Sequence, residues 1–157
     1  MNSELIAQYA HIWKVFERLV DDFDETSWIH TGRKATTPAR LSFHILKSTK
    51  YYIEDISVME FASGKSFDVN CETGSEEALP SRSDIIYCIR EFAKKTECWI
   101  AEMDLSSVNT AFEWAGKTKM GVVLFLLKHS VYHLGELSSL LNESKNGEAE
   151  DNYVKAL

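Results

Sequence analysis

Two histidines in the stretch KHSVYHLGEL (residues 128–137) have the clearest potential for chemistry in this sequence. His129 and His133 are four residues apart in an otherwise apolar run. On an α-helix such residues share one face, with their Cβ atoms about 5–6 Å apart. Two neutral imidazoles placed in this way can bind one divalent ion, at about 2.0–2.1 Å each for zinc. They could instead be core histidines, each with a buried hydrogen-bond partner of its own.

A metal site needs a third ligand from another helix, and His44 is the candidate in this sequence. The two other histidines, His11 and His30, fall on the first predicted helix and in the connection that follows it. Glu136 is three residues after His133 and shares its face, so it could hydrogen-bond a ligand, act as a base or be a bystander. The zinc-protease motif H-E-x-x-H, the E-x-x-H pairs of di-iron bundles and the haem motif C-x-x-C-H do not occur in the sequence.

Four segments with the apolar periodicity of amphipathic helices would position these residues. Helix-start signals support them: Ser3 as an N-cap, Thr37 before Pro38, and Ser81 with Asp84 as a capping box. The predicted helices span approximately residues 3–23, 38–61, 81–103 and 118–143.

Polar connections separate the predicted helices. The first, residues 24–37, has Trp28 and Ile29 as its large apolar anchors. The stretch 62–80 is the longest without a periodic pattern, and such loops are usually functional or disordered. No segment has the period of a strand, so the sequence predicts an all-α, up-down four-helix bundle with long connections in residues 1–143. Residues 144–157 are predicted to form a polar, flexible tail.

The composition excludes several classes of function. A net charge of −7 argues against a nucleic-acid partner, which requires a basic face. The longest apolar run, Val122 to Leu127, has six residues, whereas a bilayer span needs about 20. The N-terminus has no signal-peptide pattern, and the odd set Cys71, Cys88 and Cys98 contains no C-x-x-C pair. We therefore expect a cytoplasmic protein with free thiols and no membrane partner.

The order and spacing of these pieces resemble the DinB/YfiT-like metalloenzyme family. The matching segments are the Trp28 connection, PARLSFHILKSTKYY with His44, and FLLKHSVYHLGEL, in which a glycine follows the second histidine of the pair. The resemblance covers residues 1 to about 143. It implies a four-helix bundle with a divalent ion held by His44, His129 and His133. It also implies a homodimer, which the apolar character of the 118–143 helix independently suggests.

This sequence departs from the family pattern at two positions. Members of the family often carry Gln where this chain has Glu136, and many carry an acidic residue where it has Ser48. The second difference puts the family's general base in doubt for this chain. Around the site, the sequence predicts that four aromatic residues could line a cleft and that Lys47 could orient an anionic substrate. The four are Tyr51, Tyr52, Trp114 and Tyr132.

Three imidazole ligands leave coordination positions open, which is typical of catalytic rather than structural sites. A bound ion would lower the pKa of water toward about 7 or bind a thiol as thiolate. The family includes thiol-dependent S-transferases and a maleylpyruvate isomerase. The resemblance therefore implies a metal-dependent transferase or hydrolase that acts on a small molecule. It also implies a low-molecular-weight thiol as a candidate partner. Zinc or nickel is expected, and iron, copper or manganese would also fit.

Two alternatives remain open from the sequence. The first is a non-catalytic metal-binding or stress-associated bundle, in which the ion is structural or adventitious. The second is a helical dimerisation module without metal. That reading requires His129 and His133 to be bonded to protein carbonyls or carboxylates.

Overall fold

The computed structural model describes residues 1–33, 36–54, 59–60, 66–67 and 75–157. This part of the chain is all-α, apart from a two-residue antiparallel pair in which β1 (Met59–Glu60) lies against β2 (Ser66–Phe67). The long helices are α1 (Asn2–Asp22), α3 (Pro38–Ile53), α4 (Arg82–Ala101) and α5 (Lys119–Ser144). Shorter elements are α2 (Glu25–His30), α6 (Asn152–Lys155) and the 3₁₀ turns η3 (Glu76–Ala78) and η4 (Glu113–Ala115).

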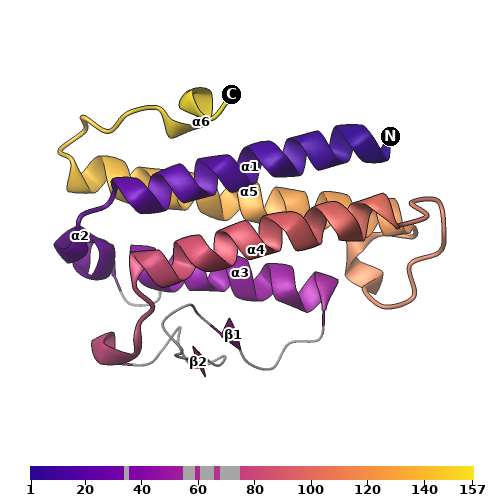
Figure 1. The fold of residues 1–157 in the computed structure, drawn as a ribbon, viewed down its shortest axis with the longest axis horizontal. Coiled ribbons are helices and arrows are strands. Elements are labelled where there is room, and N and C mark those ends of the chain that lie inside the picture. Colours follow the sequence, from indigo (N-terminus) through magenta and orange to yellow (C-terminus); the bar gives the residue numbers. More distant parts are fainter. Residues whose placement is uncertain (34–35, 55–58, 61–65, 68–74) are drawn as a thin grey trace.

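The four long helices lie side by side, with α1 and α5 running in one direction and α3 and α4 in the other (Figure 1). Hydrogen bonds and ion pairs agree with this arrangement. The Tyr9 hydroxyl donates to the Val123 carbonyl at 2.6 Å near the start of both α1 and α5. Lys95 Nζ lies 2.7 Å from Glu54 Oε1 near the end of both α4 and α3. The parallel pair α3 and α4 differs from the alternating up-down order predicted from the sequence, because α3 ends and α4 begins at opposite ends of the helices.

The helices form because their apolar residues recur every three or four positions and pack into one core. The apolar stripe that the sequence predicts for the first helix consists of Leu5, Tyr9, Ile12, Phe16, Leu19 and Phe23. All of these residues are buried except Leu5, which is half-buried. The side chains with the lowest exposure come from all four long helices, from α2 and from Phe23, which directly follows α1. The largest of them are Trp28, Tyr9, Phe16, Phe23, Phe43, Leu19, Ile45, Leu46, Ile85, Ile89, Ile100 and Leu126.

The starts of α3 and α4 agree with the sequence signals, and the start of α1 differs from them. The predicted capping box is present: Ser81 Oγ accepts from the Asp84 N–H at 3.1 Å, and Asp84 Oδ2 accepts from the Ser81 N–H at 3.2 Å. Pro38 stands in the first turn of α3, but the Thr37 hydroxyl makes no capping bond. Met1 rather than Ser3 is the N-cap residue of α1.

Helix α3 ends at Ile53, whereas the sequence predicts a helix to about residue 61. Glu54 is extended, and its N–H makes the last bond, to the Lys50 carbonyl. The Glu54 carboxylate then pairs with Lys95 of α4. The sequence also predicts that Ile56 is buried by this helix and that residues 62–80 form a long loop. Ile56 and most of that loop lie outside the described residues.

The first connection holds α2, a short helix that the sequence does not predict. Asp24 caps it by accepting a hydrogen bond from the Ser27 N–H at 2.8 Å. Trp28 is buried, as expected for an apolar anchor, and its Nε1–H donates to the Pro80 carbonyl at 2.9 Å. The indole therefore ties this connection to the segment that precedes α4.

The C-terminal segment packs on α1, although the sequence predicts a flexible tail (Figure 1). Asp22 joins the two: its Oδ1 lies 2.6 Å from Lys145 Nζ and its Oδ2 accepts from Asn152 Nδ2 at 3.1 Å. Asn152 and Ala156 are buried. Polar composition alone could not reveal this docking, because it depends on pairing with a residue more than a hundred positions away.

Two of the three cysteines can be described. Cys88 and Cys98 are not joined in a disulfide, as predicted, and Cys71 lies outside the described residues. Burial, followed by the negative charge of Asp84, raises the pKa of Cys88 to about 12. The Cys88 thiol is therefore protonated at neutral pH and packs as a small apolar group.

Helix α5 has a buried side and an exposed side, although its sequence is apolar nearly all round. Leu126 and Leu137 are buried, whereas Leu124, Val131 and Tyr132 are exposed. The homodimer expected from this apolar character stays a prediction. Among the described residues, no helix combines the length and the apolar character that a bilayer crossing requires.

Candidate metal centre

The fold brings His44 of α3 together with His129 and His133 of α5. One ring nitrogen of each histidine can be chosen so that all three atoms lie within 4.8 Å of one another. The centroid of the His44 ring is 5.2 Å from that of His129 and 4.6 Å from that of His133, and the two α5 rings are 4.5 Å apart. The sequence predicts this set of three, and the structure shows that their side chains converge.

One pair of ring nitrogens has the spacing that a metal ion requires. Nε2 of His44 lies 3.3 Å from Nε2 of His129. Two nitrogens bound to one tetrahedral ion at about 2.0–2.1 Å lie about 3.3–3.4 Å apart. The two imidazoles therefore present their nitrogens at a distance that one zinc-sized ion could bridge.

His133 is held by the carboxylate of Glu136, one turn later on α5. The hydrogen bond between His133 Nδ1 and Glu136 Oε2 is 2.7 Å long. An ionised carboxylate can only accept, so Nδ1 carries the proton and Nε2 keeps its lone pair. Metal-binding histidines usually have such a carboxylate or carbonyl on the nitrogen away from the ion. The structure thus gives Glu136 a partner, and favours the role of hydrogen-bond acceptor among those left open by the sequence.

His129 is held in its neutral form by its surroundings. Burial, followed by the neighbouring imidazoles of His133 and His44, lowers the pKa of His129 to about 4. Its ring is therefore neutral at physiological pH, which is the form that binds metals. Its Nδ1 is buried and has no hydrogen-bond partner among the described residues. The alternative without metal requires a carbonyl or carboxylate partner for both α5 histidines, and among the described residues such a partner is present for His133. The Nε2 atom of His129 has a different neighbour, the Nε2 atom of His44 at hydrogen-bond distance.

The remaining histidines lie elsewhere, as the sequence predicts. His11 Nε2 is 3.0 Å from the Tyr153 carbonyl oxygen, where it contacts the C-terminal segment. His30 Nδ1 is 3.6 Å from Glu76 Oε1 at the protein surface. Neither histidine belongs to the group whose nitrogens converge.

Aromatic side chains extend from the histidines toward the end of α3. The Tyr132 ring stands edge-on to the His133 ring at 5.1 Å and is otherwise exposed. Phe125, one turn before His129, lies 5.8 Å from the Tyr52 ring, whose hydroxyl accepts from Trp114 Nε1 at 2.9 Å. Tyr52 and Trp114 are two of the four residues predicted to line a cleft, and the structure places them next to each other in one aromatic cluster.

Two other residues predicted to surround the site, Tyr51 and Lys47, lie on α3. Tyr51 is exposed and packs against Tyr52, with ring centroids 5.4 Å apart. Lys47 and Ser48 are half-buried on α3. The proposed contact of Lys47 with an anionic substrate stays a prediction.

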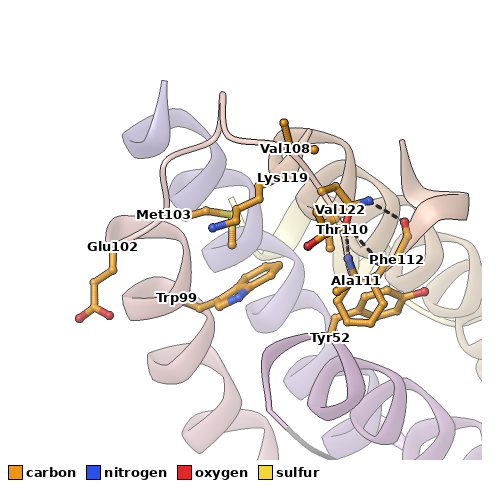
Figure 2. A pocket seen from close by; sticks show the side chains of 11 residues that line it. Tyr52, Trp99, Glu102, Met103, Val108, Thr110, Ala111, Phe112, Lys119 and Val122 are labelled. Atoms are coloured by element: carbon orange, nitrogen blue, oxygen red, sulfur yellow. Dashed lines mark hydrogen bonds between the residues drawn. The ribbon is translucent and has the colours of Figure 1, made fainter. Parts of the chain in front are cut away.

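A cavity of about 330 Å³ lies beyond Tyr52, between α4, the start of α5 and the connection that joins them (Figure 2). No histidine occurs among its described lining residues. From the sequence, residues 104–118 are predicted only to connect two helices, and no cavity is predicted there. Val108 and Phe112, two apolar residues in a segment without helical period, were the signal that could have revealed it.

Comparisons with models of protein families, with curated proteins and with solved structures found no match to this chain. The case for a metal centre in the structure therefore comes from its residues. Three imidazoles converge from two helices, one of them is oriented by a carboxylate, and one buried ring has a low pKa. This donor set fits a divalent ion of the zinc type.

Proposed function

We propose that this chain is a metal-dependent enzyme of the DinB/YfiT-like kind, acting on a small molecule as a transferase or hydrolase. Its divalent ion would be held by His44, His129 and His133. The observation that carries the proposal is the convergence of their ring nitrogens within 4.8 Å, on two helices that meet through a shared core.

Each residue has a separate role in this proposal. His44 and His129 bind the ion through the Nε2 atoms that lie 3.3 Å apart. His133 binds through Nε2 as well, since its Nδ1–H is engaged by Glu136. Glu136 is a positioning residue: it fixes the tautomer and the ring orientation of His133, and its negative charge raises the basicity of that ligand.

The ion, when bound, would supply Lewis acidity to water or to a thiol. Three imidazole donors leave at least one position of a tetrahedral ion for such a molecule. The site has access to solvent on the side of His133, whose side chain is 18% exposed, and of Glu136, at 41%. Zinc and nickel are the preferred ions for imidazole donors at these positions, with iron, copper and manganese as further candidates.

The family assignment is supported by the order of the elements along the chain. One histidine comes from the long helix that starts with Pro38, and the other two lie four apart on the last long helix. Four long helices pack around one core, as in a four-helix bundle. A low-molecular-weight thiol is the cosubstrate that the family resemblance suggests.

Metal content separates this proposal from a bundle without metal. The purified protein should contain about one equivalent of divalent metal per chain, and the His129→Ala/His133→Ala variant should contain almost none. His30→Ala is the matched control, because His30 lies outside the group of converging nitrogens. Equal and substoichiometric metal in all three proteins would contradict the site.

Turnover separates the enzyme from a non-catalytic metal-binding protein. A panel of low-molecular-weight thiols with electrophilic acceptors, and of esters and amides with water, should give activity that a chelator abolishes and added metal restores. A protein that binds one ion tightly and turns over none of these substrates would favour the alternative, a structural ion in a binding or stress-associated bundle.

A further inference from the structure

The cavity beside Tyr52 is separate from the histidines and has a chemistry of its own. It is lined by α4 and α5 and by the connection between them, through Trp99, Met103, Phe112 and Val122 among others (Figure 2). Val122 and His129 are seven residues apart on α5, which corresponds to about 10 Å along the helix. A molecule in the cavity would therefore lie about two helical turns from the proposed ion.

The walls of the cavity are mainly apolar and aromatic. The rings of Trp99, Tyr52 and Phe112 and the thioether of Met103 are half-buried, and Val122 is buried. Aromatic and thioether groups pack well against the faces and edges of a flat ring. A volume of about 330 Å³ is at the small end of the range for ligand pockets. The cavity thus suits a compact molecule with one or two rings.

One wall is fixed by the side chain of Asn109. Its Nδ2 donates to the carbonyls of Phe112 at 2.6 Å and of Gly116 at 2.7 Å, and its Oδ1 accepts from the Phe112 N–H at 3.0 Å. The Lys119 N–H also bonds to the Ser107 carbonyl at 3.0 Å. These bonds hold the connection in shape without a ligand, so binding would cost little ordering of the chain.

Lys119 gives the cavity a positive charge. It is the first residue of α5, where the helix dipole is also positive. Its ammonium group makes no ion pair with any described residue, whereas Lys94, Lys95 and Lys145 each pair with a carboxylate. The nearest acidic influence is Asp104, an exposed carboxylate whose pKa is lowered by hydrogen bonds from Ser106 and, to a smaller extent, by the charge of Lys119. In Figure 2 the Lys119 side chain extends between Met103 and Trp99, while the Glu102 carboxylate points away from it.

We propose that this cavity binds a small aromatic carboxylate, with the ring between Trp99, Phe112 and Met103 and the carboxylate on the ammonium of Lys119. The site goes beyond the proposed function, because none of its lining residues is a metal ligand. It would act as a ligand site of its own or hold the aromatic part of a larger substrate.

The test uses 2-naphthoate as the probe and its neutral amide as the comparison. We expect 2-naphthoate to bind the full chain with a dissociation constant below about 1 mM and to shift the indole N–H signal of Trp99 in NMR spectra. Lys119→Met should weaken the binding of 2-naphthoate about three- to fivefold, the upper part of the range for an exposed ion pair, and should leave the binding of 2-naphthamide unchanged. Lys117→Met is the matched control, since Lys117 does not line the cavity.

Three results would overturn this proposal: no shift of the Trp99 signal at millimolar 2-naphthoate, equal affinity in the Lys119→Met variant, or equal affinity for acid and amide in the unmodified chain. The His129→Ala/His133→Ala variant should bind 2-naphthoate as the unmodified chain does. A variant that loses the metal and still binds the probe would agree with both the metal site and the carboxylate site. The two proposals are therefore tested independently.

Discussion

The carboxylate of Glu136 accepts a hydrogen bond of 2.7 Å from Nδ1 of His133, three residues before it on α5. This bond determines which nitrogen of His133 is available for a ligand. It also distinguishes His133 from His129, whose buried Nδ1 has no partner among the described residues. The two α5 histidines are therefore alike in sequence but different in environment.

Removal of this carboxylate should weaken metal binding. Glu136→Ala should lower the affinity for zinc about 10- to 100-fold, the usual effect of losing a partner of a ligating histidine. Glu136→Gln should cost less, because the amide oxygen can still accept from Nδ1–H. Competition with a chromophoric chelator measures both. Glu143→Ala, an exposed carboxylate on the same helix, serves as control, and equal affinities in the Ala variants would show that Glu136 is a bystander.

The sequence could predict the histidines of the site but not all of its surroundings. The spacing of His129 and His133 determines a shared face on any α-helix, so their proximity follows from local structure. The contact with His44 depends on how α3 and α5 pack. The sequence offers His44 as the candidate third ligand, and the family resemblance supports that choice. The cavity near Lys119 could not be predicted, because it is shaped by an irregular connection whose hydrogen bonds are made by Asn109.

Two helix starts provide a matched test of capping. Ser81→Ala should destabilise the protein by about 1 kcal/mol, since it removes the hydroxyl that accepts from the Asp84 N–H. Thr37→Ala should cost less, because the buried Thr37 hydroxyl has no hydrogen-bond partner among the described residues. Urea unfolding of both variants measures the difference. A larger loss in Thr37→Ala than in Ser81→Ala would contradict this account of the two caps.

The Asp22 carboxylate should control the docking of α6 on α1. Burial acts to raise the pKa of Asp22, but hydrogen bonds from Lys145 and Asn152 outweigh it and lower the pKa below its ordinary value. A lowered folded pKa means that the anchor is present above the unfolded pKa of about 3.9 and is lost as the pH falls through the folded pKa. At neutral pH, Asp22→Asn should speed hydrogen exchange of the α6 amides.

The same reasoning predicts how this effect depends on pH. The difference in exchange between the unmodified chain and Asp22→Asn, corrected for intrinsic rates, should begin to shrink as the pH falls below the unfolded pKa of about 3.9. It should disappear only below the lowered folded pKa, where Asp22 is protonated in both states. Asp21→Asn is the control, since Asp21 contacts Arg82 only through its backbone carbonyl. Equal exchange in the three proteins at pH 7 would show that Asp22 does not hold the segment.

The course of the chain between and after the helices was harder to predict than the helices themselves. The stripe of α1 and the capping box of α4 are local patterns, and both are present. The end of α3 at Ile53 and the docked C-terminal segment depend on partners distant in sequence. Glu54 pairs with Lys95 and Asp22 with Lys145, and no local pattern encodes either pair.

Anomalous scattering from crystals of the zinc-saturated protein tests the metal centre most directly. The account predicts one strong peak at the zinc edge, about 2.0–2.1 Å from Nε2 of each of His44, His129 and His133, with the Glu136 carboxylate retained on His133 Nδ1. A peak bound by other residues, or none among the three histidines at full zinc occupancy, would contradict it.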